Sequence, residues 1–96
     1  MPMARHTVLW SGDVQGDFTE LWVDSDSSRR NRLTDIANTV DRELAVSPEA
    51  LGELLPSEPE LRVWELPGFS PPVSVVYEVL PDDRVVRVLR LRLAVQ

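Results

Sequence analysis

The chain lacks the residues that build most metal sites and hydrolytic triads. It has no cysteine and only one histidine, His6. Without cysteine there are no disulfides and no thiolate metal ligands, and a single histidine argues against a histidine metal site or a Ser-His-Asp triad. No apolar run is long enough to span a membrane, and the segment Met1–Arg5 is not followed by the apolar stretch of a secretory signal. We therefore expect a cytoplasmic protein that uses no metal and no cofactor.

Lysine is also absent, so all ten basic residues are arginines. A GC-rich genome would produce this bias without any functional cause. The other interpretation is functional, because arginine binds phosphate and carboxylate groups in a bidentate way that lysine does not. Sixteen acidic residues bring the net charge to −6, which argues against free-standing nucleic-acid binding. A role on nucleic acid would have to use a local basic patch.

The first half of the chain predicts a strand followed by two helices. Residues 6–10 alternate as a strand does, with Val8 and Trp10 on one face. Ser11 is a suitable cap for a helix whose apolar face is spaced at helical intervals. That face consists of Val14, Phe18, Leu21 and Trp22. After a short polar break, a second helix should begin at Ser27 or Ser28 and end near Val46, with the apolar face Leu33, Ile36, Ala37, Val40 and Leu44.

The second half predicts three strands after an acidic loop over residues 49–59. The segment 61–66 alternates strictly, with Arg62, Trp64 and Leu66 on one side. Residues 72–80 and 84–93 flank a Pro-Asp-Asp turn, which is a strong hairpin signal. The predicted order is β-α-α-β-β-β. We expect one domain, residues 1–96, of the α+β class, with two N-terminal helices packed on a small antiparallel sheet.

The last strand is cationic in an acidic protein. Residues 84–96 contain four arginines and no acidic residue. Strict alternation places Val85, Leu89, Leu91 and Leu93 on the face toward the helices, with Arg87 as an exception. It places Arg90 and Arg92 on the opposite face with Arg84, Val86 and Val88. We expect an anionic ligand or partner to bind at that opposite face; the alternative is a charge ladder that only prevents aggregation.

In element order and motifs the chain resembles the RelE/ParE superfamily of bacterial toxins, also called plasmid-stabilisation proteins. The resemblance lies in Val8-Leu9-Trp10-Ser11 before an acidic helix, in Val75-Val76-Tyr77-Glu78-Val79, and in the arginine-rich strand that follows. It implies a toxin of a type II toxin–antitoxin system, neutralised by a cognate antitoxin and assembled with it. The implied activities are growth inhibition through cleavage of messenger RNA on the ribosome or through inhibition of DNA gyrase.

Two departures from the family pattern put nuclease activity in doubt. The ribosome-dependent nucleases usually carry a basic residue three positions before the hairpin tyrosine, where this chain has Ser74. They also usually continue into a basic segment after the last strand, whereas residues 93–96 carry no charge. Arg62 does match a basic position of the second strand. The resemblance therefore favours a toxin-like fold, while the residues do not favour a competent nuclease.

The candidate catalytic residues are Arg62, Tyr77, Arg90 and Arg92. Arginine stabilises the charge of a phosphoryl transition state but is a poor proton-transfer group near neutral pH. Tyr77 is the candidate acid, although a tyrosine in this motif is more often structural. The candidate partner- or target-binding residues are Trp64, Arg84 and Arg87, with Trp64 expected to be half-exposed. The alternative function is a non-catalytic or degenerate interaction domain that retains the toxin fold.

Overall fold

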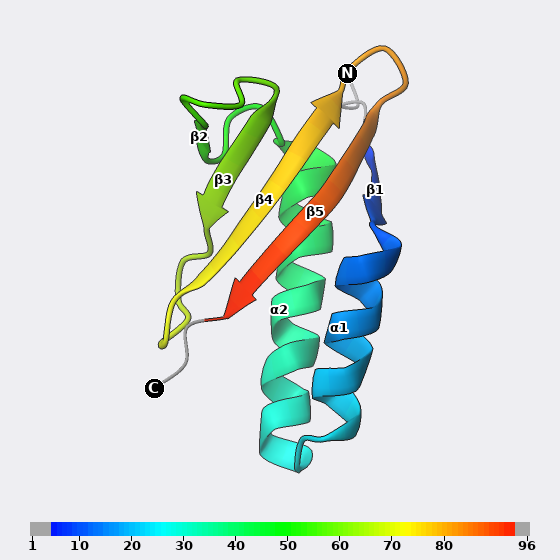
Figure 1. The fold of residues 1–96 in the computed structure, drawn as a ribbon, viewed down its shortest axis with the longest axis vertical. Helices are drawn as coiled ribbons and strands as arrows, with labels where there is room; N and C mark the ends of the chain where they lie inside the picture. Colours follow the sequence, from blue (N-terminus) through cyan, green and yellow to red (C-terminus); the bar gives the residue numbers. More distant parts are fainter. Residues whose placement is uncertain (1–4, 94–96) are drawn as a thin grey trace.

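The computed structural model describes residues 5–93, which form a helical hairpin packed on one face of a sheet (Figure 1). The elements in chain order are β1 (Thr7–Trp10), α1 (Gly12–Val23), α2 (Ser27–Val46), β2 (Glu53–Leu54), β3 (Leu61–Glu65), β4 (Val73–Leu80) and β5 (Val85–Leu93). The predicted α+β class and element order are confirmed, with the short strand β2 added inside the expected loop. Within the described residues no helix is long and apolar enough to cross a membrane.

The sheet is mixed rather than purely antiparallel. Its strands lie in the order β1-β5-β4-β3-β2. Strand β1 pairs with β5 in parallel, from Thr7 opposite Val85 to Trp10 opposite Val88, and the other neighbours are antiparallel. The prediction of a purely antiparallel sheet is therefore wrong for β1. Its parallel direction follows from the long connection between β1 and β5, which can carry the chain back to the same end of the sheet.

Both helices begin at a side-chain cap. The Ser11 hydroxyl accepts a hydrogen bond from the Val14 amide at 3.3 Å, as predicted. The α2 cap is Asp26, which accepts from the Arg29 amide at 2.9 Å and stands one residue before the expected serines. Each cap satisfies an amide that the first helical turn leaves without a partner.

The core lies between α2 and the sheet. Helix α2 buries four residues at helical spacing, Leu33, Ile36, Val40 and Leu44. Helix α1 contributes less than its apolar face predicts, because only Val14 is buried while Leu21 and Trp22 are 42% and 36% exposed. The ends of both helices extend past the end of β5 (Figure 1), so this part of α1 has no strand beneath it.

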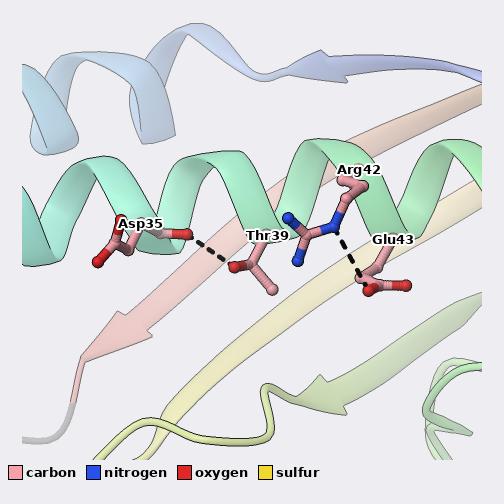
Figure 2. A network of polar contacts seen from close by, with 4 residues as sticks. All are labelled: Asp35, Thr39, Arg42 and Glu43. Carbon is pink, nitrogen blue, oxygen red and sulfur yellow. Dashed lines mark hydrogen bonds and ion pairs between the residues drawn. The ribbon is translucent and has the colours of Figure 1, made fainter.

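The part of α2 around Asp35, Thr39 and Arg42 makes local polar contacts. The Thr39 hydroxyl donates to the carbonyl oxygen of Asp35 at 2.7 Å, and the Arg42 guanidinium lies 3.6 Å from the Glu43 carboxylate (Figure 2). Such exposed ion pairs contribute between 0 and about 1 kcal/mol. This part of α2 is therefore a solvated surface, and the packing of the helix depends on its apolar side.

Arg32 attaches the β3–β4 connection to α2. Its two terminal nitrogens donate to the carbonyl oxygens of Ser70 and Pro71 at 2.6 and 2.8 Å, and its guanidinium lies 5.9 Å from the Phe69 ring centroid. Two charge-assisted hydrogen bonds from one planar guanidinium group fix the orientation of the loop as well as its distance from α2.

An extra residue in β5 changes which side chains face the helices. Tyr77 pairs with Val88 and the preceding Val76 pairs with Arg90, so Leu89 has no opposite residue in β4. Such a bulge reverses the alternation of the strand. Val86 and Val88 are consequently buried, which corrects the expected outward orientation of these two valines. Beyond the bulge, Leu91 and Leu93 pack against the core as predicted.

Candidate functional site

The face of the sheet that points away from the helices, called the open face below, carries most of the charges of the strands. Residues that pair across neighbouring strands share a face, so the register defines the rows of side chains on it. The rows are Leu80, Val85 and Thr7; then Leu61, Glu78, Arg87 and Leu9; then Glu53, Val63, Val76 and Arg90; and finally Glu65, Ser74 and Arg92. No described element covers this face (Figure 1).

Because of the bulge at Leu89, Arg87 lies on the open face together with Arg90 and Arg92. Arg87, Arg90 and Arg92 are all exposed there. Arg87 donates to the Glu78 carboxylate at 3.0 Å, whereas Arg90 and Arg92 have no ion pair within residues 5–93. Residues two apart in a strand are separated by roughly 7 Å. Two uncommitted guanidinium groups at this spacing can bind one extended anionic group or two neighbouring ones.

The part of the open face that β2 and β3 form is acidic. Glu53 and Glu65 line a shallow hollow of about 470 Å³ together with Gly52, Val63 and Ser74. The backbone of Gly52 has φ +66°, and a Cβ there would lie 2.4 Å from the Val63 carbonyl oxygen, so only glycine fits. The described part of the chain contains no group of three or more histidine, cysteine, aspartate or glutamate side chains that could hold a metal ion.

Tyr77 is a core residue. Its side chain is fully buried, and its hydroxyl lies 2.7 Å from the carbonyl oxygens of both Pro48 and Leu51, to which it can donate. Burial raises the pKa of Tyr77 to about 12, although the nearby Arg62 guanidinium acts in the opposite direction. A buried phenol with this pKa is poorly placed to give a proton to a substrate near neutral pH. The position suits the structural role of this tyrosine rather than the catalytic one.

The remaining candidates are dispersed. Arg62 pairs with Tyr77 in the register and therefore lies on the helix side of the sheet, away from Arg90 and Arg92. Trp64 is only 7% exposed, so the expectation that it is half-exposed is wrong: its neighbour across the strand is the buried Val75. Arg84 lies in the β4–β5 turn with φ 54°. The structure therefore brings Arg87, Arg90 and Arg92 together on the open face, and it places Arg62 beside Tyr77 on the helix side.

A groove lies between α1 and β5. Strand β1 stops at Trp10, and the last hydrogen bond on that side joins the Ser11 amide to the Val88 carbonyl at 2.9 Å. The outer edge of β5 is therefore not covered by β1 from residue 89 to residue 93. The groove, about 380 Å³, is lined by those five residues and by Asp13, Val14, Asp17, Phe18 and Leu21. The groove follows from the unequal length of the two strands, four residues against nine.

Comparison with solved structures shows that the chain has the RelE fold. The RelBE2 toxin–antitoxin complex of Mycobacterium tuberculosis matches with a TM-score of 0.74 at 18% identity, over 97% of this chain and 95% of that chain. The intact E. coli RelBE complex matches with a TM-score of 0.59 at 22% identity, over 95% and 99% of the two chains.

A third match is a free E. coli RelE mutant in which two arginines, two positions apart, are replaced by alanine. Its TM-score is 0.58 at 20% identity, and 91% of this chain and 81% of that chain are covered. No family model and no curated protein matches the sequence. The comparisons therefore establish the fold, while the activity has to be argued from the site.

Proposed function

We propose that this chain, which has the RelE fold, is the cytoplasmic toxin of a type II toxin–antitoxin module and binds its target through Arg90 and Arg92. The observation that carries the proposal is the exposure of these two arginines, without an ion pair within residues 5–93, on a sheet face that no described element covers. Exposed guanidinium groups that are not engaged inside the molecule are available for an external anion.

The proteins that share the fold support the same conclusion. Two of them were crystallised as toxin–antitoxin complexes. The mutated E. coli toxin lacks two arginines that are two positions apart, and Arg90 and Arg92 have this spacing in β5. We infer that the arginine pair of this chain has a functional role.

The antitoxin would dock in the groove between α1 and β5. An extended segment can pair with the backbone edge of residues 89–93 and insert apolar side chains beside Phe18 and Leu21. Leu21, which is 42% exposed, would then be covered. The resulting complex would contain both toxin and antitoxin chains. The antitoxin would wrap around the toxin surface rather than fill a closed pocket.

Arg90 and Arg92 bind and stabilise charge, and as arginines they do not transfer protons near neutral pH. Cleavage of RNA by a ribose 2′-hydroxyl needs a base for that hydroxyl and an acid for the leaving oxygen. Tyr77 is buried and Arg62 lies on the helix side of the sheet, so neither joins Arg90 and Arg92. Inhibition of a target by tight binding, as for DNA gyrase, requires only the charges that are present.

The alternative function is a non-catalytic interaction domain that retains the toxin fold. The favouring observation is the composition of the open face, where the polar side chains are guanidinium groups, carboxylates and the hydroxyls of Thr7 and Ser74. Such a domain would bind its partner without stopping growth.

Induced expression in a bacterial host separates the two functions. A toxin arrests growth, and the R90A/R92A variant should not arrest growth while remaining folded. Where arrest occurs, intact message together with gyrase-dependent DNA breaks indicates gyrase, and cleaved message indicates translation. Normal growth of cells that express the wild type and R90A/R92A at equal soluble levels would contradict the toxin function and favour the interaction domain.

A further inference from the structure

The open face carries equal numbers of charges of each sign. Its cations are Arg87, Arg90 and Arg92, and its anions are Glu53, Glu65 and Glu78. A surface that binds nucleic acid gains its affinity by neutralising backbone phosphates, so carboxylates on the same surface oppose binding. This balance agrees with the net charge of −6 for the chain, and the cationic strand does not make the surrounding face basic.

The charges are separated in space. Glu78 is paired with Arg87 at 3.0 Å, which leaves Arg90 and Arg92 on β5 and the two carboxylates of the hollow near β3. No ion pair crosses this gap among the described residues, although Glu65 and Arg92 stand in one row with Ser74 between them. Strands β3 and β5 are two strand spacings apart, roughly 10 Å.

A short apolar strip lies between the two charged patches. Val63 and Val76 are half-buried neighbours in the row that runs from Glu53 to Arg90. A face with an apolar centre and charges at its margins has the anatomy of a protein–protein interface. Complementary charges on the partner would fix its register and exclude wrong partners.

We propose that the target bound by the open face is a folded protein, whose surface presents an acidic group to Arg90 and Arg92 and a basic group to Glu53 and Glu65. Glu65 lies on β3 and Glu53 on β2, so the two groups are two to three strand spacings apart, roughly 10–14 Å, on either side of an apolar contact. This inference rests on the proposed toxin function and names the class of its target. A nucleic-acid target would place phosphates near Glu53 and Glu65, where like charges repel.

The two target classes predict opposite signs for one substitution. Replacing both glutamates by glutamine, E53Q/E65Q, keeps their size and removes two negative charges. A protein target with a basic group loses its partner charge, and we expect a twofold to thirtyfold weaker affinity, on the order expected for two exposed ion pairs. A nucleic acid instead loses a repulsion, so its affinity rises. The matched control is E20Q/D35N, which changes the charge of the two helices by the same amount.

The experiment measures the inducer concentration that halves the growth rate for the wild type, E53Q/E65Q and E20Q/D35N at equal expression. The inference predicts that E53Q/E65Q needs more inducer, while E20Q/D35N behaves as the wild type does. Arrest by E53Q/E65Q at the same or a lower concentration overturns the inference and leaves the toxin function standing. Absence of arrest by the wild type overturns the toxin function, and the inference with it.

A direct binding measurement supplies the second readout. The probe is a short fluorescein-labelled single-stranded RNA, followed by fluorescence anisotropy at about 50 mM and about 200 mM salt, the range over which phosphate contacts weaken steeply. We expect no saturable binding by either the wild type or E53Q/E65Q at the higher salt concentration. RNA binding that becomes tighter in E53Q/E65Q would overturn the protein-target inference.

Discussion

Replacing Tyr77 by phenylalanine removes a hydroxyl from the centre of the fold without changing the shape of the ring. The carbonyl oxygens of Pro48 and Leu51, both 2.7 Å from that hydroxyl, would lose a donor. A buried acceptor without a partner costs about 1–3 kcal/mol. In a domain of this size each kcal/mol lowers the Tm by about 4–8 °C. We therefore expect Y77F to melt at least about 4 °C below the wild type.

The pH dependence tests the same contact independently. The pKa of Tyr77 is about 12 in the folded chain against 10.0 for the free side chain. Because the folded pKa is the higher one, the folded state holds the proton more tightly. The stabilisation is complete below pH 10 and is lost as the pH rises from 10 to 12, by at most roughly 1.4 kcal/mol per pH unit. The chain has no lysine, no cysteine and no other tyrosine, so no other side chain is expected to titrate in this window.

The assay is urea unfolding of the wild type and Y77F at intervals between pH 8 and pH 12. Y77F should be less stable at pH 8 and should show a flat profile where the wild type declines. T39V is the control, since it removes an exposed hydroxyl that bonds only within α2. Equal stability of Y77F and the wild type, or the same decline in both above pH 10, would refute the structural role assigned to the Tyr77 hydroxyl.

Three further substitutions test other parts of the account. G52A should cost about 2 kcal/mol or more in urea unfolding, because φ is +66° and the new Cβ would meet the Val63 carbonyl oxygen; unchanged stability would contradict the close approach of these two backbone segments. R32A removes two hydrogen bonds to the β3–β4 loop and should cost about 1–3 kcal/mol, with faster proteolysis of the loop as the readout. In urea unfolding, the free energy of unfolding of R90A/R92A should equal that of the wild type within roughly 0.5 kcal/mol. A larger loss would mean that the arginines support the fold.

Much of the architecture could be predicted because periodicity reports burial. Helical spacing identified the α2 residues that are buried, including Ile36 and Val40, and strict alternation placed Trp64 and Leu66 on one side of β3. That alternation also predicted Arg90 and Arg92 on the face away from the helices. These predictions depend on local patterns, which the packed structure preserves.

The errors arose where the regular pattern is interrupted. Alternation assumes an unbroken pleat, and the extra residue Leu89 reverses it, so Val86 and Val88 are buried and Arg87 joins the open face. Nothing in the local sequence of β5 specifies the position of a bulge, because it depends on the register with β4. Alternation grouped Arg62 with Trp64 and Leu66, but it did not show that this side faces the helices, away from Arg90.

The most direct test of a toxin that acts through Arg90 and Arg92 is colony formation after tightly controlled induction, compared for the wild type, R90A/R92A and R29A/R42A. The last variant removes two exposed arginines from α2 and matches the charge change of the first. We expect the wild type and R29A/R42A to stop growth, while R90A/R92A forms colonies as the uninduced cells do. Arrest by R90A/R92A at wild-type levels, or growth of all three at equal soluble expression, would contradict it.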